Sequence, residues 1–378
     1  MAIKIVIWRY FEDKCVILWQ NLEAMDEIYY EVLDLLKTLI SIPRVSREEA
    51  RAADAVEAFL RGRGRGCAVR RSGNNVWCLS DDFDAARPTI LLNSHIDTVK
   101  PVAGWTYPAN EPTEVDDRLY GLGSNDAGAS LVSLIATFLL LRSSSQAYNL
   151  ILLASCEEEV SGRNGLESVL PMLPPIDVAI VGEPTGMHPA VAEKGLMVLD
   201  GEVCGVSGHA ARSEGVNAIY KALPVVERLR SLQFDRVSDF LGPVKISVTQ
   251  ISAGTQHNVV PDLCRIVVDV RTTDAYSNEH TLEMIRAAVP DCRLEPRSTR
   301  LRPSSIALSH PIVSRLVTLG REPFGSPTLS DQALMPFPSV KVGPGDSSRS
   351  HTADEYICFD EIREAIQLYM TVLDGLRL

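Results

Sequence analysis

The strongest constraint on the fold comes from three short apolar runs, each of which ends in imidazole or carboxylate side chains. They are "TILLNSHID" (residues 89–97), "NLILLASCEEE" (149–159) and "IDVAIVGEP" (176–184). Continuous apolar runs of this length are typical of strands that are buried on both faces of a sheet. A further strand is expected at "NNVWCLS" (74–80), and the helical segment "GASLVSLIATFLLLRSS" (128–144) lies between two of the runs. The pattern predicts an α/β sheet domain.

Imidazole and carboxylate groups close these runs, at the strand ends where open α/β sheets place their ligands. His95 and Asp97 end the first run, Glu157–Glu159 end the second and Glu183 ends the third. Each group alone has an ordinary explanation, since a single histidine is usually a surface or core residue and an acidic triplet is usually a solvated turn. Several carboxylates in one place, however, repel one another and are costly to desolvate without a cation.

Two further residues extend this set, Asp126 in "GLGSNDAGAS" and His351 in "SRSHTADEY". A cleft lined by imidazole nitrogens and carboxylate oxygens suits zinc or a similar divalent cation. The sequence therefore predicts a metal site.

The pattern changes between residues 190 and 297, where strands alternate with two helices in the order β-α-β-β-α-β. This order is that of the ferredoxin-like arrangement, an antiparallel sheet backed by two helices. We interpret residues 190–297 as an inserted second domain, flanked by residues 25–189 and 298–378 of the first domain.

Residues 1–24 are interpreted as an N-terminal extension. The segment begins apolar, but charged residues from Arg9 onward interrupt it too soon for a membrane span, and it has no signal-peptide cleavage pattern. Helical spacing of apolar residues begins only after Asp26. We hypothesise that Met25 is the biological start, and we expect neither export nor a membrane partner.

Composition argues against several classes of function. The formal net charge of −12 shows no basic patch that could neutralise phosphates, so nucleic acid and anionic membrane surfaces are poor candidate partners. Eight cysteines without a Cys-x-x-Cys spacing argue against a zinc ribbon and a disulfide scaffold, and favour reduced thiols in the cytoplasm. "GLGSNDAG" lacks the Gly-x-Gly-x-x-Gly of a dinucleotide site, and the serines lack the Gly-x-Ser-x-Gly elbow of serine hydrolases. A small-molecule substrate is expected.

An ordered set of seven motifs resembles the zinc aminoacylase and carboxypeptidase superfamily of metallopeptidases. Within it, the acetylornithine deacetylase and succinyl-diaminopimelate desuccinylase group is the most similar. The motifs are "HIDT", "GLGSNDAG", "CEEEVSGRNG", "GEPT", "GHAARSEGVNAI", "GTQHNVVPD" and "SHTADEY". The resemblance spans about residues 26–378, and the C-terminal part is most similar to acetylornithine deacetylase-type proteins. It implies a mixed-sheet di-zinc hydrolase domain with an inserted ferredoxin-like dimerisation (lid) domain.

The resemblance also implies a role for each residue of the site. His95 and Glu183 would bind one metal ion, Glu159 and His351 the other, and Asp126 would bridge the two. Asp97 would hydrogen-bond His95 and fix its tautomer. Glu158 would be the general base, which takes a proton from water and later delivers it to the leaving amine. Zinc is expected at both positions, with cobalt and manganese as alternatives.

The acidic run leaves two registers open. The family pattern is Asp-Glu-Glu, and an alignment without gaps makes Glu158 the base and Glu159 the ligand. A slip of one residue would move the two roles to Glu157 and Glu158.

Three residues of the inserted domain complete the implied site. In the family, the histidine equivalent to His209 reaches the active site of the partner subunit and stabilises the tetrahedral oxyanion, so a homodimer through the inserted domain is expected. Asn258 and Arg271 match positions that contact the substrate carboxylate or the oxyanion, and the planar fork of arginine suits a carboxylate. A local salt bridge is the alternative for Arg271.

The implied activity is removal of an N-acyl group from an amino acid. The resemblance favours N-acetyl-L-ornithine, or N-succinyl-L-ornithine, with L-ornithine as the product in arginine biosynthesis. A dipeptidase, a desuccinylase or another N-acyl-amino acid hydrolase of the same superfamily is the alternative within catalysis. Outside it, the alternative is an inactive metal-binding dimer.

Overall fold

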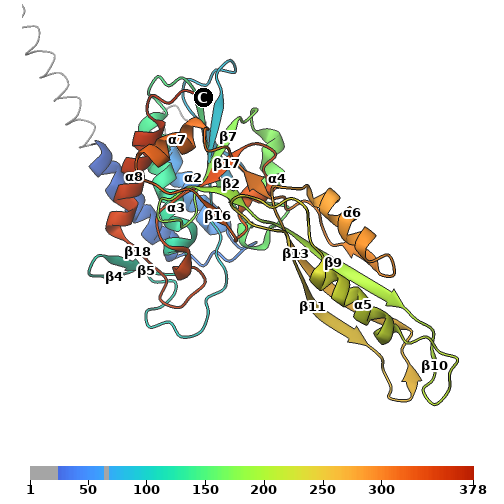
Figure 1. Ribbon diagram of the computed structural model, residues 1–378. Helices are drawn as coiled ribbons and strands as arrows, with labels where there is room; N and C mark the ends of the chain where they lie inside the picture. The colour runs from blue at the N-terminus through green and yellow to red at the C-terminus, as the bar shows by residue number, and fades with distance from the viewer. Residues whose placement is uncertain (1–23, 64–67) are drawn as a thin grey trace, which may run out of the picture. The chain divides into compact units, whose positions relative to one another are not determined.

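The computed structural model describes residues 24–63 and 68–378. Residues 1–23 of the expected N-terminal extension lie outside the described residues. The chain forms two compact units. The first unit comprises residues 1–189, 309–322 and 341–378, and the second comprises residues 190–308 and 323–340. Figure 1 shows the elements of both.

A mixed sheet forms the centre of the first unit. Its strands lie in the order β1 (Arg70–Ser72), β2 (Asn75–Leu79), β6 (Asn149–Ser155), β3 (Thr89–His95) and β7 (Val178–Val181). β3 pairs in parallel with both β6 and β7, whereas β2 pairs antiparallel with β1 and β6. Every residue of β3, β6 and β7 is buried, as their apolar sequences require. The prediction of an α/β fold with a mixed sheet is confirmed.

Helices pack around this sheet. They are a helix over residues 24–40, α2 (Ala50–Arg63), α3 (Ala129–Leu141), α4 (Leu166–Val169), α7 (Pro311–Thr318) and α8 (Phe359–Leu373). The segment Ser124–Leu141 is long and apolar enough to cross a membrane, but 83% of it is buried inside the protein, as in the core helix of a soluble protein. A small antiparallel sheet of β4 (Thr113–Val115), β5 (Arg118–Tyr120) and β18 (Tyr356–Cys358) completes the unit.

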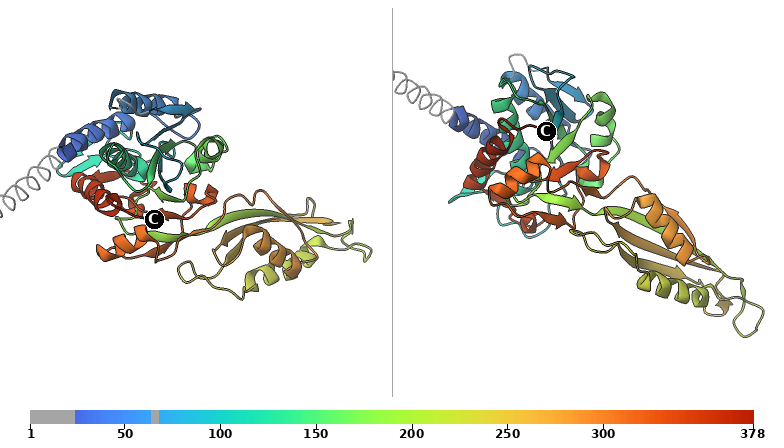
Figure 2. Two further views of the ribbon diagram at one scale, coloured as in Figure 1. Left: turned by 90° about the horizontal axis from the view of Figure 1, so that it is seen from above. Right: turned by 45° about the horizontal axis from the view of Figure 1, so that its top comes forward.

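The second unit is built on a four-stranded antiparallel sheet. Its elements follow in the expected order, β9 (Gly195–Cys204), α5 (Ala218–Ser231), β11 (Lys245–Ala253), β13 (Leu263–Thr272), α6 (Asn278–Ala288) and β14 (Arg293–Pro296). The strands lie in the order β11-β13-β9-β14, which is that of the ferredoxin-like arrangement. Alternate residues of β9 and β13 join α5 and α6 in one apolar core, and no helix of the described residues covers the other face of the sheet (Figure 2).

The second unit extends beyond the boundary expected at residue 297. β8 (Ala190–Glu193) pairs antiparallel with β15 (Ser304–Ser305) and parallel with β16 (Phe324–Ser326), and this pairing joins residues 298–308 and 323–340 to it. Two short strands, β10 (Gly208–His209) and β12 (Val259–Val260), form a separate pair. The chain leaves the unit through β17 (Ser339–Lys341). The functional division into domains stays a prediction.

Candidate active site

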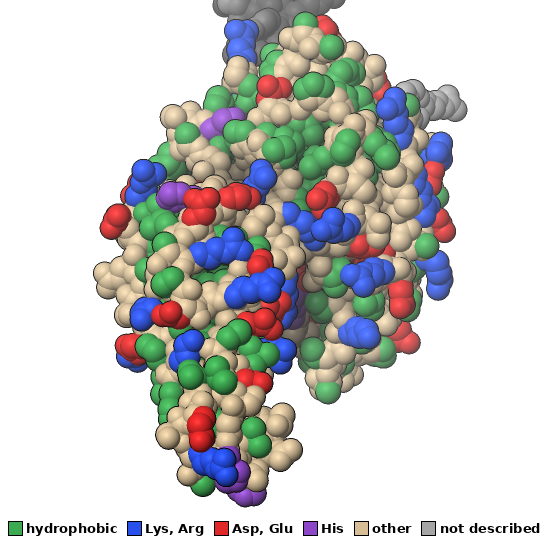
Figure 3. Space-filling model, turned by 90° about the vertical axis from the view of Figure 1, so that its right-hand side faces the viewer, with side chains coloured by type: hydrophobic (Ala, Val, Ile, Leu, Met, Phe, Trp, Pro, Cys, Tyr) green, Lys and Arg blue, Asp and Glu red, His purple; other side chains and the backbone are tan. Residues whose placement is uncertain are grey.

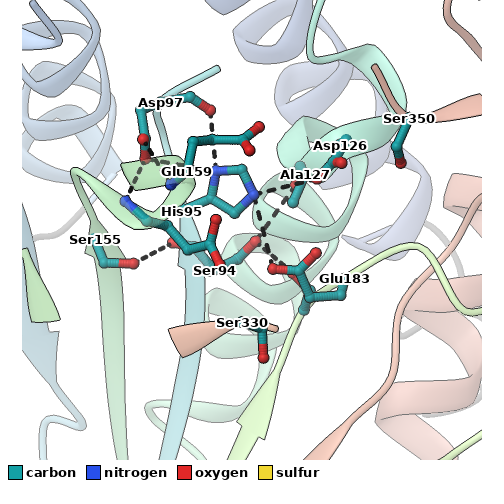
Figure 4. Close-up of polar contacts among 12 residues, drawn as sticks. Ser94, His95, Asp97, Asp126, Ala127, Ser155, Glu159, Glu183, Ser330 and Ser350 are labelled. Atoms are coloured by element: carbon teal, nitrogen blue, oxygen red, sulfur yellow. Dashed lines mark hydrogen bonds and ion pairs between the residues drawn. The ribbon is translucent and has the colours of Figure 1, made fainter. Parts of the chain in front are cut away.

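His95 is the last residue of β3 and is almost completely buried. Its Nδ1 lies 2.9 Å from the backbone carbonyl oxygen of Asp97, so a proton on Nδ1 donates to that carbonyl. Its Nε2 faces two carboxylates, at 3.3 Å from Oδ1 of Asp126 and 3.7 Å from Oε1 of Glu183 (Figure 4). With the proton held on Nδ1, the lone pair of Nε2 points into the carboxylate cluster, which is the orientation that a metal ligand needs.

The carboxylate of Asp97 has partners that the sequence analysis did not predict. Its Oδ1 lies 3.6 Å from Nδ1 of His95, which is too long for a hydrogen bond. The Oδ1 of Asp97 accepts the backbone N–H of Glu158 at 3.1 Å. Its Oδ2 accepts the backbone N–H of Glu159 at 3.1 Å and the hydroxyl of Ser46 at 2.7 Å. Asp97 therefore meets His95 at hydrogen-bond distance through its carbonyl and at ion-pair distance through its carboxylate, and the orienting role of the carboxylate stays a prediction. The carbonyl of Asp97 orients His95, and the carboxylate fixes the turn after β6.

The acidic run after β6 divides into two parts. Glu157 has a left-handed backbone (φ 57°), is buried, and its carboxylate accepts the side-chain amide of Asn164 at 2.9 Å. Glu158 and Glu159 instead each join His95 in groups of side chains whose ligand atoms lie within 4.8 Å of one another. One group is His95, Glu158 and Glu183, and the other is His95, Asp126 and Glu159. This geometry favours the register without a gap.

His351 lies on the opposite side of Asp126 from His95. Its Nε2 is 3.1 Å and 3.3 Å from the two carboxylate oxygens of Glu159, and 3.6 Å from Oδ2 of Asp126. Each oxygen of Asp126 therefore faces one imidazole, Oδ1 facing His95 and Oδ2 facing His351. A carboxylate placed in this way can share one oxygen with each of two cations.

Two residues that the sequence analysis did not assign hold the loop of Asp126 in place. The buried Glu355 accepts three backbone N–H groups of that loop, from Gly123 (3.0 Å), Asn125 (2.9 Å) and Asp126 (2.8 Å). Arg44, which is also buried, donates to the carbonyl of Gly123 at 2.9 Å and to that of Ile96 at 2.7 Å. Arg44 thereby ties the loop of Asp126 to the end of β3, which carries His95.

Little in the sequence indicates that Glu355 and Arg44 support the site. Glu355 belongs to the same "SHTADEY" motif as His351, four residues later, but an acidic residue there has no feature that separates it from a solvated one. Arg44 stands in "SIPRVS", far from every motif. Arg44 also explains why position 123 is a glycine, because a Cβ there would overlap the guanidinium of Arg44.

Burial and crowded charges raise the pKa of four groups in and beside the site. Burial lowers the pKa of His95, but the neighbouring carboxylates, Asp126 foremost, outweigh it and hold the pKa well above its usual range. Burial, with the charge of Asp126, raises the pKa of Glu183 to about 8. The hydrogen bond to Glu159 raises the pKa of His351 to about 9. Burial also raises the pKa of Glu355 to about 7. Imidazole nitrogens and crowded carboxylate oxygens fit divalent cations, which relieve this repulsion.

We expect zinc binding to release protons at neutral pH. The pKa values of Glu183 and His351, about 8 and about 9, leave both groups largely protonated at pH 7, and a ligand must be deprotonated to bind a metal. The apparent affinity should therefore rise as the pH increases from 6 to 8.5. Calorimetry in buffers of different ionisation enthalpy measures the protons released, and a heat of binding that is independent of the buffer would contradict the expectation.

The three remaining predicted residues belong to the second unit, whereas the five predicted metal ligands belong to the first. His209 lies in β10 and is exposed, and Nδ1 of its ring accepts the N–H of Ala211 at 3.1 Å. Asn258 lies beside it, because its carbonyl accepts the N–H of Ala210 at 3.0 Å. Arg271 forms a bidentate contact with Asp269, at 2.9 Å and 3.2 Å. The local salt bridge considered for Arg271 is thus present.

The mixed α/β sheet and the cluster of imidazole and carboxylate groups at its strand ends define a metal-dependent hydrolase. A model of the peptidase family M20/M25/M40 matches residues 91–375. The chain belongs to this family.

Similar proteins carry names from both activities of the group that the motifs indicated. A protein of Mycobacterium tuberculosis (strain CDC 1551 / Oshkosh), provisionally named succinyl-diaminopimelate desuccinylase DapE, is 32% identical over 362 residues, which cover 91% of this chain and 98% of the relative. Acetylornithine deacetylase of Aliivibrio salmonicida (strain LFI1238) is 27% identical over 302 residues, 74% of this chain and 79% of the relative. The resemblance inferred from the motifs is confirmed.

A solved structure agrees with the fold. The crystal structure of aminopeptidase PepT from Bacillus cereus ATCC 10987 superposes with a TM-score of 0.74, covering 92% of this chain and 98% of PepT. At 16% sequence identity this similarity shows the fold alone.

Proposed function

We propose that the protein removes the N-acyl group from an N-acyl-amino acid with the help of two divalent cations, zinc at both positions, with cobalt or manganese as substitutes. The observation that carries the proposal is the placement of Asp126 between His95 and His351, with Glu159 and Glu183 beside them. His95 and Glu183 would hold one cation, Glu159 and His351 the other, and Asp126 both. Once bound, the cations supply Lewis-acid activation of the substrate carbonyl and of water.

Glu158 is the proposed general base. The turn that carries it is fixed by the Asp97 carboxylate, and its own carboxylate lies with His95 and Glu183 in one group. From this position it takes the proton of the attacking water and delivers it to the nitrogen of the leaving amine, which balances the hydrolysis of the amide. Glu157 cannot share this role while its carboxylate is bound to Asn164.

The second unit supplies the remaining groups of the proposal. His209 stabilises the oxyanion from the partner subunit of a homodimer, and Asn258 and Arg271 bind the substrate. Large apolar side chains on α5 support a dimer, because Tyr220 is 72% exposed and Leu223 is 59% exposed. On the face drawn in Figure 3, acidic and basic side chains are interspersed, so this face has no continuous basic patch of the kind that binds nucleic acid or an anionic membrane surface. We place the enzyme in the cytoplasm.

The substrate is proposed to be an N-acylated diamino acid. The C-terminal motifs favour N-acetyl-L-ornithine, as in arginine biosynthesis, and the name of the Aliivibrio relative agrees. The name of the M. tuberculosis relative favours a succinyl group. N-succinyl-L-ornithine and N-succinyl-L,L-diaminopimelate therefore belong in the same comparison.

The test is amine release from these three substrates and from a dipeptide, measured side by side with the zinc-loaded protein. Turnover of an N-acylated diamino acid above the dipeptide supports the proposal and identifies the acyl group. Turnover of the dipeptide alone would replace the deacylase with a dipeptidase. A dimer that holds two zinc ions and hydrolyses none of the four would favour the inactive metal-binding alternative.

A further inference from the structure

The two histidines of the site are held in different ways. His95 ends β3, is almost completely buried, and its Nδ1 meets the carbonyl of Asp97. The side chain of His351 is 52% exposed, and over residues 24–63 and 68–378 the hydrogen-bond partners of its ring all lie at Nε2. Its backbone is left-handed (φ 59°) and lies in a turn. The position of the His351 ring therefore depends on how this turn is attached to the rest of the first unit.

The fully buried side chain of Asn125 makes this attachment. Its Oδ1 accepts the backbone N–H of Asp346 at 3.0 Å, and its Nδ2 donates to the backbone carbonyl of the same residue at 3.1 Å. The Nδ2 also donates to the hydroxyl of Ser350 at 3.3 Å, and Ser350 immediately precedes His351. Figure 4 shows Ser350 beside Asp126. One amide therefore joins the loop of Asp126 to both ends of segment 346–350.

The surroundings of Asn125 are shaped for this contact. Gly345 has a left-handed backbone (φ 88°), and a Cβ there would lie 2.2 Å from Oδ1 of Asn125. The backbone N–H of Asn125 donates to Glu355 at 2.9 Å, so the residue is fixed through its backbone as well as through its amide. All of these residues belong to the first unit. A glycine at position 345 lets the turn of His351 approach the loop of Asp126 closely enough for the amide to bond it.

We propose that Asn125 is a positioning residue for one of the two cations, the one between Glu159 and His351. Without the amide of Asn125, segment 346–350 loses three hydrogen bonds to the loop of Asp126. His351 then loses its fixed place opposite Asp126, although every ligand side chain is still present. The inference rests on the proposed two-cation function and adds to it that the two cation positions are supported separately.

The other cation position keeps its supports when Asn125 is changed. Glu355 and Arg44 bond backbone groups of residues 123–126, and these bonds do not involve the Asn125 side chain. The carbonyl of Asp97 still meets Nδ1 of His95. The position between His95 and Glu183 should therefore bind its cation as before.

The first test measures the two zinc dissociation constants by competition with a chelator. Asn125→Leu keeps a side chain of similar size and removes all three hydrogen bonds of the amide. One constant should rise about 10- to 100-fold, the range for loss of a group that supports a ligand, and the other should change less than about 2-fold. Anomalous diffraction at the zinc edge should then show lowered occupancy beside Glu159 and His351, and full occupancy beside His95 and Glu183.

Asn149→Leu is the matched control. Asn149 is fully buried too and begins β6, at the opposite end of that strand from the acidic run. It makes the same two-way contact with a backbone, since its Oδ1 accepts the N–H of Asp84 at 2.9 Å and its Nδ2 donates to the carbonyl of Asp84 at 2.8 Å. Both variants should lower the melting temperature, but Asn149→Leu should leave both zinc constants within about 2-fold of wild type. If Asn149→Leu weakens the same ion as strongly, the effect of Asn125 is one of general stability and the proposal is overturned.

Ser350→Ala tests the same link with a milder change. It removes the acceptor of one of the three hydrogen bonds, so it should raise the same zinc constant about 5-fold, the effect of losing one hydrogen bond. If Asn125→Leu does not fold, an unchanged constant in Ser350→Ala would overturn the proposal.

The wild-type protein separates this inference from the proposed function. If wild type binds two zinc ions but hydrolyses no N-acylated substrate, the proposed function falls, and the zinc constants still decide the role of Asn125. If wild type is active with two ions and Asn125→Leu binds both as tightly, the inference falls alone. Equal weakening of both ions in Asn125→Leu would overturn the assignment of Asn125 to one position.

Discussion

Replacement of Glu158 by Gln should leave a folded protein that holds two metal ions and has lost about 10²- to 10⁴-fold in kcat, the range that a positioned general base contributes. The amide is nearly isosteric with the carboxylate but cannot accept the proton of the attacking water. The backbone N–H of residue 158, which donates to Asp97, is unchanged, so the turn after β6 should keep its shape. Steady-state kinetics together with metal analysis measure both parts of the prediction.

Glu157→Gln is the matched control for this variant. The side chain of Glu157 is one residue away but is bound to Asn164 and takes no part in the groups around His95. We expect Glu157→Gln to keep turnover within a few-fold of wild type. If Glu157→Gln is inactive and Glu158→Gln is active, the register of the acidic run is shifted by one residue.

Removal of the Asp126 carboxylate should have the second large effect. Asp126→Ala takes away the side chain whose two oxygens face His95 and His351, at 3.3 Å and 3.6 Å. The bound metal should fall from two ions to at most one, and kcat/KM should fall by more than about 100-fold, since even groups that only support a ligand cost 10- to 100-fold. Metal analysis after dialysis and steady-state kinetics give the two values.

Asp360→Ala serves as the control for Asp126→Ala. Asp360 is an exposed carboxylate in the first turn of α8, in the same unit, and is not part of the groups around His95. The Asp360→Ala variant should bind two metal ions and retain full activity. Two ions in Asp126→Ala would contradict the bridging position of this carboxylate.

The sequence was sufficient to predict the sheet and most of the site. β3, β6 and β7 each contain a continuous apolar run because both of their faces are buried, and such runs are visible without a structure. Parallel strands place their carboxyl ends at one edge of the sheet, so the polar residues after them were expected to meet there. His95, Glu159 and Glu183 do so. Asp126 lies in the short helical turn Ser124–Gly128 and His351 in a turn outside the strands, and only their motifs indicated them.

The parts that the sequence could not predict depend on backbone groups. Glu355 and Arg44 act on the N–H and carbonyl groups of residues 123–126, and backbone groups leave no pattern in a sequence. The same holds for the carbonyl of Asp97, which lies 2.9 Å from Nδ1 of His95. In the acidic run, the left-handed conformation of Glu157 turns one of three identical side chains away from the others, and no property of three consecutive glutamates reveals which one turns.

The most direct measurement of the central claim is the number of metal ions bound per chain. Protein equilibrated with zinc and dialysed should contain two zinc ions by inductively coupled plasma mass spectrometry, and stepwise removal with a chelator should abolish amide hydrolysis that added zinc restores. A protein that hydrolyses the N-acylated substrate with no metal bound, or that never holds more than one ion, would contradict the two-cation centre.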